Sequence, residues 1–217
     1  MPSLTQVICL ANSWKRGGRC IAGINPRTGQ WVRPVSQLPY GQVSQEMRRI
    51  DCREPELLDL LKIPLDKTGE NFGFESENRT ILPGKWRRVG HISPQNVLPY
   101  CSEEEYILHN NERYVALPFL QSLPERDRKT LQLIQAIEFS VRFTGKRFVA
   151  TLATGRGKTL TAPITDPVYA YRLELGIRPS VPCLVTVSLS MPWQPADWEG
   201  EIPCWKLIAA VIELGKW

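Results

Sequence analysis

Residues 131–143, LQLIQAIEFSVRF, carry the pattern that decides the fold. Their odd-numbered positions are Leu, Leu, Gln, Ile, Phe, Val and Phe, so only Gln135 interrupts an apolar face. The even-numbered face carries the polar residues Gln132, Glu138, Ser140 and Arg142. Alternation with a period of two is typical of a strand with one buried face, whereas a helix repeats every 3.6 residues or so, about one turn. The segment therefore predicts one long strand.

The sequence on the carboxyl side of this segment continues as strands. RFVATLAT (147–154) and TLTAPITD (159–166) flank GRGK, which is typical of a hairpin turn. CLVTVSLSM (183–191) alternates cleanly, and CWKLIAAVIEL (204–214) is apolar on both faces, as a covered strand would be. The second half thus predicts five strands, which is the strand count of an OB-type barrel.

The first half also reads as short strands joined by glycine-rich loops. TQVICL (5–10), RCIAGI (19–24) and QWVRPVS (30–36) are separated by turn signals, and KWRRVGHI (85–92) is typical of a closing strand. The expected helices are short: residues 54–63, stopped by a proline, and residues 102–112, capped by Ser102.

These patterns predict a mostly β protein of two tandem small OB-like β-barrels with a few short helices. The proline-punctuated segment LPFLQSLPERDRK (117–129) reads as the connection between them. We expect a first barrel over residues 1–120 and a second over residues 121–217. The rival fold is a PUA-like RNA-binding barrel, which would form one continuous barrel with flanking helices.

Charge is distributed unevenly along the 217 residues. The net charge is +5, an excess that permits an anionic partner without requiring one. Residues 1–50 hold seven basic residues against one acidic residue, and residues 126–158 hold eight against two. Two basic segments therefore flank a slightly acidic middle.

Several classes of protein are not expected from this sequence. It has no apolar run long enough to span a bilayer and no secretory leader pattern. The six cysteines are scattered without a C-x-x-C pair, and neither histidine lies near them, so we expect no metal and no cofactor. The scattered cysteines favour a reducing, cytoplasmic setting. Without an apolar run that could span a bilayer, we also expect no membrane partner.

Three separated motifs resemble the dual OB-containing domain family of prokaryotic proteins. They are ICLANSWKRGGRCIAGINPRTGQWVRPVS (8–36), ITDP (164–167) and WKLIAAVIEL (205–214). Together they frame nearly the whole chain, although residues 40–125 match only loosely. The resemblance implies two OB barrels in tandem and a nucleic-acid or nucleotide role. It supplies no settled activity and no catalytic residues.

The first basic segment is a candidate anion site. Lys15, Arg16 and Arg19 surround a Gly-Gly pair, where free backbone amides and cations suit phosphates. By period two, Trp31 and Arg33 share a face, so the tryptophan is a candidate for base stacking and the arginine for a phosphate contact. Two further candidates precede the loop: Asn12 and Ser13. The competing interpretation is a basic hairpin with solvated cations, turn-forming Asn and Ser, and Trp31 in the core.

The second basic segment places Arg156 and Lys158 at a predicted hairpin tip. With Lys146 and Arg147 at the preceding turn, they form a predicted second basic rim. TGRGKT (154–159) is not a phosphate-binding Walker loop, because Leu152 stands where that motif needs its first glycine.

We therefore expect a non-catalytic binding protein that recognises single-stranded nucleic acid or a nucleotide through basic loops and aromatic residues. One alternative is a protein-interaction adaptor with a protein partner, because OB barrels also dock proteins. The other is an effector enzyme that acts on nucleic acid through Asp166 or Cys20.

Overall fold

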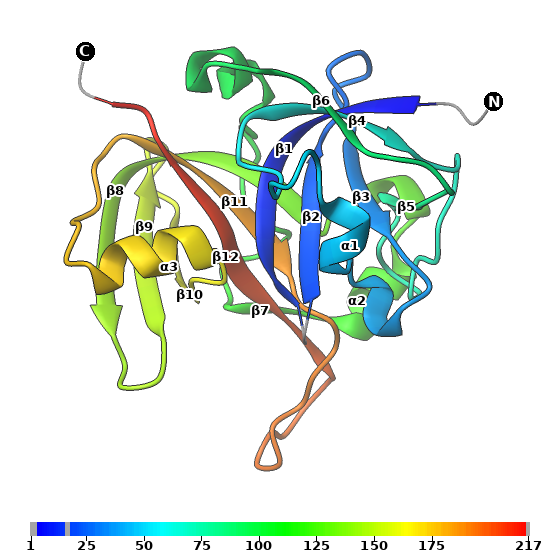
Figure 1. Ribbon diagram of the computed structural model, residues 1–217. Coiled ribbons are helices and arrows are strands. Elements are labelled where there is room, and N and C mark those ends of the chain that lie inside the picture. The colour runs from blue at the N-terminus through cyan, green and yellow to red at the C-terminus, as the bar shows by residue number, and fades with distance from the viewer. Residues whose placement is uncertain (1–3, 16–17, 216–217) are drawn as a thin grey trace. The chain divides into compact units, whose positions relative to one another are not determined.

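The computed structural model of the protein describes residues 4–15 and 18–215, and the chain divides into two compact units, Met1–Val97 and Leu98–Trp217 (Figure 1). The predicted boundary near residue 120 differs from this division. Strand β7 (Tyr114–Ala116) pairs with β12 (Pro203–Glu213), so residues before 120 already belong to the second sheet.

The first unit is a six-stranded sheet in the order β5-β3-β2-β1-β4-β6. Its strands are β1 (Leu4–Lys15), β2 (Gly18–Ile24), β3 (Trp31–Val35), β4 (Asp59–Pro64), β5 (Asn78–Thr80) and β6 (Arg87–His91). Strand β5 runs parallel to β3, and β6 runs antiparallel to β4. These pairings give β5 and β6 the same direction, so together they act as one interrupted fifth strand.

Alternating apolar residues of these strands build the core of the first unit. Its buried members are Val7, Cys9, Ile21, Val32, Val43, Ile50, Leu61, Ile63, Leu65 and Trp86. They come from β1 to β4 and from the connections that cover the sheet. The sequence predicted β1 only to residue 10, but antiparallel pairing with β2 carries it on to Lys15.

The second unit repeats this topology with the order β10-β9-β8-β11-β12-β7. Its remaining strands are β8 (Leu131–Phe143), β9 (Phe148–Thr154), β10 (Thr159–Pro163) and β11 (Cys183–Leu189). A parallel bridge between Ile164 and Ile208 joins the end of β10 to β12. Five strands of each unit therefore follow the Greek-key order of an OB barrel, with the fifth strand parallel to the third.

The predicted long strand 131–143 is confirmed, but its two halves have different surroundings. Residues 131–136 pair with β11 and are buried except for Gln135. A β-bulge between Ala136 and Glu138 then breaks the period of two, and Glu138–Phe143 pairs with β9. The bulge leaves Ile137 49% exposed, although the pattern placed it on the buried face.

Both predicted helices are wrong. Residues 59–64 form β4, because Leu61 and Ile63 alternate into the core while the backbone pairs with β1. Residues 102–112 contain no helix, because the Gln132 side chain bonds the Leu108 N–H and the Tyr106 carbonyl and holds this segment against β8.

The observed helices lie elsewhere and are short. They are η1 (Pro39–Gly41), α1 (Gln45–Arg48), η2 (Pro94–Tyr100), α2 (Leu117–Ser122), η3 (Glu125–Asp127) and α3 (Pro167–Glu174). Helix α3, between the third and fourth strands of the second barrel, begins at an aspartate cap followed by proline, a start signal that the sequence contains. The fold class is mostly β, with two OB-like barrels in tandem. No helix within residues 4–15 and 18–215 is long and apolar enough to cross a membrane.

Candidate nucleic-acid interface

The β1–β2 hairpin of the first unit presents a tryptophan beneath a cation. Trp14 on β1 lies opposite Arg19 on β2, and Lys15 lies opposite Gly18. The guanidinium of Arg19 stands 4.1 Å from the centre of the Trp14 ring, and Trp14 is still 60% exposed. We call Trp14, Lys15 and Arg19 the hairpin tip. Arg16, also predicted to bind anions, lies outside the described residues.

A second loop of the same barrel meets the hairpin tip. The ammonium nitrogen of Lys15 lies 5.8 Å from the centre of the Phe72 ring, in the connection between β4 and β5. These two loops correspond to the first-to-second and fourth-to-fifth strand loops of an OB barrel, which frame the ligand face in that fold. The hairpin tip therefore stands at the position where OB barrels hold their ligands.

Arg19 shares the Glu54 carboxylate with Arg48. Its Nε lies 3.8 Å from Glu54, whereas Arg48 donates to the same carboxylate at 2.8 Å. The hydrogen bond from Arg48 is the largest reason why the pKa of Glu54 lies below its usual value. Because Arg48 also contacts this carboxylate, Glu54 would keep a cation beside it if Arg19 bound a phosphate.

Arg33 is buried and paired instead of facing a ligand. It is 1% exposed and contacts Glu75 and, at 2.8 Å, Glu77. Burial alone would lower the pKa of Arg33, but the two carboxylates raise it well above its usual value. Trp31, two residues earlier on β3, is half-buried. Of the pair that the sequence placed together as a binding face, the structure therefore leaves only Trp31 partly accessible.

Asn12 and Ser13 lie beneath the hairpin tip, on β1. The side-chain amide of Asn12 donates to the Pro55 carbonyl oxygen at 2.8 Å, and Ser13 is buried. Asn12 therefore helps to place the hairpin against the segment before β4. Trp14 was not among the predicted site residues, because the Ala-Asn-Ser sequence indicated that β1 ended before it. Its position opposite Arg19 depends on the register in which β1 pairs with β2, which the local sequence does not reveal.

The four cations of the predicted second rim form two separate groups. Lys146 and Arg147 lie at the β8–β9 turn, and Arg156 and Lys158 lie at the β9–β10 turn. These turns are at opposite ends of β9, about 20 Å apart for a strand of this length. The structure does not bring the four residues into one rim.

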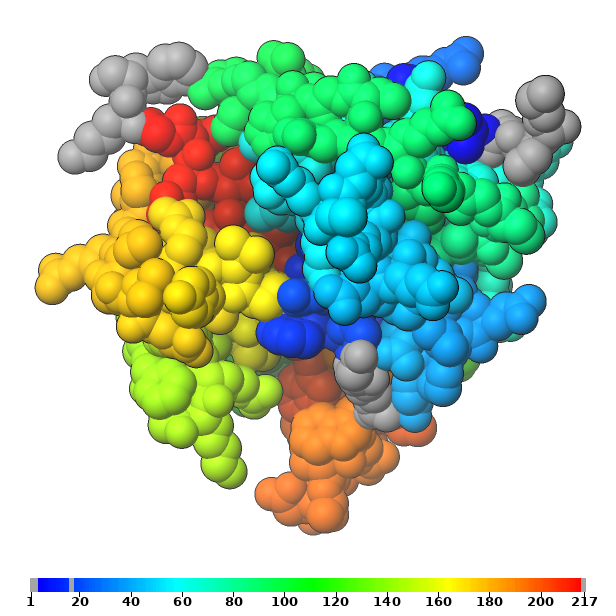
Figure 2. Space-filling view, viewed as in Figure 1, coloured from blue at the N-terminus to red at the C-terminus, as the bar shows by residue number. Residues whose placement is uncertain are grey.

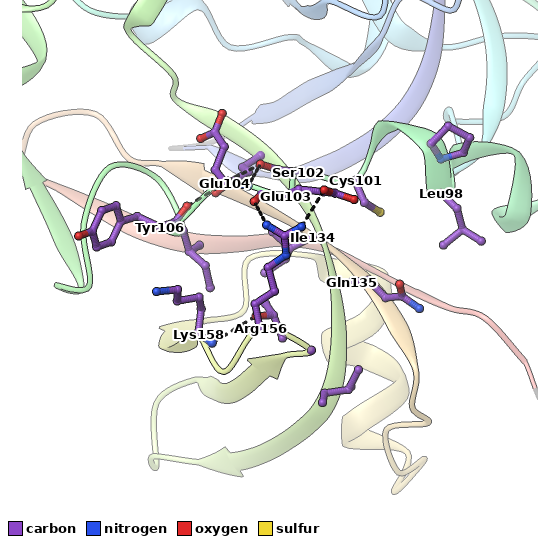
Figure 3. Close-up of a pocket in the computed structure, with 16 residues that line it drawn as sticks. Leu98, Cys101, Ser102, Glu103, Glu104, Tyr106, Ile134, Gln135, Arg156 and Lys158 are labelled. Atoms are coloured by element: carbon purple, nitrogen blue, oxygen red, sulfur yellow. Dashed lines mark hydrogen bonds and ion pairs between the residues drawn. The ribbon is translucent and has the colours of Figure 1, made fainter.

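A cavity of about 480 Å³ lies between the segment 98–107, β8 and the β9–β10 turn (Figure 3). Arg156 crosses this cavity and donates to the Glu103 carboxylate at 2.7 Å and to its carbonyl oxygen at 2.6 Å. The Lys158 ammonium lies 5.5 Å from the centre of the Tyr106 ring. Burial raises the pKa of the Cys101 thiol, which also lines the cavity, to about 11.

The charges around this cavity are largely balanced within it. Glu103 pairs with Arg156 and Glu104 pairs with Lys129, so each carboxylate already has a cation. Lys158 is left without a carboxylate partner among the described residues. A strongly anionic ligand would have to replace Glu103 at Arg156.

Asp166, one of the two residues suggested for catalysis, has a structural role. Asp166 is buried, and its carboxylate accepts hydrogen bonds from the N–H groups of Val168, Tyr169 and Val211. Asp166 therefore caps α3 and ties it to β12. Cys20 is half-buried near the start of β2.

The connection between β11 and β12 is the counterpart, in the second barrel, of the Phe72 loop. It appears in orange as a projecting lobe in Figure 2. Trp198 packs edge-on against Tyr114 and Trp205, with ring centres 4.9 and 5.1 Å apart, while Trp193 is 54% exposed. This loop carries acidic and no basic residues, so it lacks the combination of ring and cation found at the hairpin tip.

Comparison with known proteins identifies one family. The model of the dual OB-containing domain matches residues 5–211. No curated protein matches the sequence. Among solved structures, the crystal structure of the tetrameric p202 HIN2 aligns over 95% of this chain and 88% of its own, with 6% identity and a TM-score of 0.30. A superposition as loose as this one carries no argument about function.

Proposed function

We propose a function from one premise: the chain belongs to the dual OB-containing domain family. OB barrels generally bind nucleic acids. The function proposed here is binding of single-stranded nucleic acid through the hairpin tip of the first unit. No catalytic step is part of this proposal.

The exposed Trp14 beneath Arg19 is the observation that carries the proposal. An aromatic ring that remains 60% exposed can stack on an unpaired base, a contact worth about 1–3 kcal/mol. Bases in a duplex are already stacked on one another, so this mode of binding favours single strands. The Arg19 guanidinium covers one face of the ring, 4.1 Å from its centre, so a cation stands next to the stacking surface and can attract the phosphate of a bound nucleotide.

Lys15 and Arg19 supply the phosphate contacts in this proposal, and Arg16 adjoins them in the sequence. Lys146 and Arg147 are candidates for a separate, weaker contact at the β8–β9 turn. Arg156 and Lys158 contribute only where a ligand displaces Glu103 from Arg156. Arg33 is left out, because both of its carboxylate partners are buried with it.

The test is a binding titration of the full chain with fluorescently labelled single- and double-stranded DNA and RNA. Trp14→Ala should weaken single-strand binding by about 5- to 150-fold, the equivalent of losing one stacked base. Trp193→Ala is the matched control, since it removes a similarly exposed tryptophan from a loop without cations. This control should bind as the parent does.

The salt dependence of binding separates stacking from charge. Lys15→Gln with Arg19→Gln should reduce the log–log salt slope by about 0.7 for each lost phosphate contact, whereas Trp14→Ala should leave the slope unchanged. Denaturation curves must first show that each variant is folded. Unchanged binding in both hairpin-tip variants contradicts the proposal. A parent that binds no nucleic acid at all favours the adaptor role instead.

A further inference from the structure

The second half of β8 has an open edge. Residues 131–136 have β11 as a neighbour, whereas Glu138–Phe143 pairs with β9 alone (Figure 1). Among residues 4–15 and 18–215, no strand pairs with the other side of this segment. Ile137 and Phe143 are 49% and 60% exposed. An unpaired strand edge of this kind is a template for another strand.

The direction of the free backbone groups follows from the turn beside them. The Thr144 N–H donates to the Arg147 carbonyl oxygen at 3.0 Å, so this pair is hydrogen-bonded across the hairpin. Hydrogen-bonded and non-hydrogen-bonded pairs alternate along an antiparallel ladder. The backbone groups of Phe139, Val141 and Phe143 therefore point away from β9, towards the open edge.

The side chains along this edge are complementary to themselves. In antiparallel pairing of two copies about Ser140, Glu138 of one copy stands opposite Arg142 of the other, and the reverse pair forms at the same time. Phe139 stands opposite Val141, and the exposed Ile137 and Phe143 lie at the two ends of the paired segment. The Glu–Arg pairs occupy non-hydrogen-bonded positions, where facing side chains are closest.

We propose that this protein forms a two-fold symmetric homodimer by antiparallel pairing of β8 edges, residues 137–143, centred on Ser140. The partner is a second copy of the chain, and the contact is isologous, as two-fold symmetry requires. Backbone bonds from Phe139 and Val141 join the two sheets, and two Glu138–Arg142 pairs set the register. The hairpin tip takes no part in this contact.

Charged residues on an edge strand often serve to block such pairing. Blocking works when like charges or lysines meet a neighbouring strand. Here the two charges are opposite in sign and equidistant from Ser140, so symmetric pairing brings attraction at both positions. Helix α3 packs on this strand through the Phe139 and Tyr169 rings, whose centres are 6.1 Å apart. The yellow surface of this helix faces the viewer in Figure 2.

Sedimentation analysis of charge variants tests the proposal on the full chain. The parent should show a monomer–dimer equilibrium. Glu138→Arg and Arg142→Glu alone should each raise the dissociation constant about tenfold, because each places like charges opposite one another twice. The double variant Glu138→Arg/Arg142→Glu should regain parental association. An equimolar mixture of the two single variants should form a heterodimer, since its facing charges are again opposite.

Both positions are exposed, so the substitutions should leave the fold intact, and circular dichroism should confirm this. Glu125→Arg and Arg126→Glu, on the exposed η3, are controls that change the net charge equally and should leave association unaltered. A parent that is monomeric at every concentration up to about 1 mM overturns the proposal. A dimer that neither the double variant nor the mixture restores overturns the proposed register.

Discussion

The two barrels share a strand order but differ in the partners of their buried cations. In the first unit, Arg33 is 1% exposed and is held by two buried carboxylates, Glu75 and Glu77. In the second, Lys206 is also 1% exposed, but its ammonium donates to two neutral oxygens of Asn110, at 2.6 and 2.9 Å. The first unit therefore buries an ionic cluster, and the second buries a cation that donates to neutral oxygens.

The difference follows from how each barrel forms its fifth strand. In the second unit β12 is continuous and mostly apolar. In the first unit the strand is broken into β5 and β6, and Arg33 lies opposite Asn78 where β3 meets β5. Asn78 in turn donates to Glu75 and to the Glu70 carbonyl oxygen, at 2.8 and 2.7 Å. This ionic cluster therefore orders the loop that carries Phe72 beneath Lys15, which links closure of the barrel to the hairpin tip.

Removing the buried arginine should give the largest effect. Arg33→Met leaves two buried carboxylates without a cation, and breaking a buried pair in this way costs about 3–5 kcal/mol of unfolding free energy. Chemical denaturation of the parent and the variant measures this loss. The matched control is Arg172→Met in the second unit, where the half-exposed pair with Glu213 is worth about 0–1 kcal/mol. A loss for Arg33→Met no larger than the control would show that the cluster does not hold the first barrel together.

The two buried cations should also differ in their response to pH. Burial lowers the pKa of Lys206 from 10.5 to about 8, so between these values the unfolded chain binds a proton that the folded chain does not. Stability rises with pH wherever the unfolded state binds more protons. Relative to Lys206→Met, the parent should therefore gain stability as pH rises from about 8 to 10.5.

Arg33 keeps its proton throughout this window, so the difference between the parent and Arg33→Met should stay flat there. Denaturant unfolding at several pH values measures both differences. If the difference in unfolding free energy between the parent and Lys206→Met does not change with pH, the lysine ammonium is solvated instead of buried. If the difference in unfolding free energy between the parent and Arg33→Met changes with pH, the variant has altered the titration of other groups.

Local sequence patterns predicted most of the strands because alternation depends only on near neighbours. The strand predicted at 131–143 is confirmed, and the one predicted at 183–191 is found at 183–189. The pattern failed at residues 54–63, where clustered leucines indicated a helix, because pairing with β1 overrides local propensity. It also could not place the bulge at Ile137, which depends on the register of β9.

The candidate site was harder to predict than the fold. The period of two predicted that Trp31 and Arg33 share a face, but it could not reveal Glu75, which lies 42 residues beyond Arg33 in the chain. A buried arginine and a phosphate-binding arginine have the same local sequence, and only the distant carboxylates distinguish them. Trp14 was missed for a related reason, since its partner Arg19 is defined by hairpin register. The cap at Asp166 did have a local signal, aspartate before proline, although the sequence pattern placed this residue at the end of a predicted strand.

The central claim is that single strands bind mainly at the first barrel's hairpin, with at most a weaker contact at its counterpart in the second. That counterpart, the β8–β9 hairpin, presents the Phe143 and Phe148 rings 5.1 Å apart, beside Lys146 and Arg147. Ultraviolet cross-linking of a bound single-stranded oligonucleotide to the full chain, followed by mass spectrometry of the peptides, distinguishes the two hairpins directly. The account predicts an adduct on the peptide that contains Trp14, lost in Trp14→Ala. An adduct confined to the β8–β9 hairpin, or to the loop around Trp193, would contradict it.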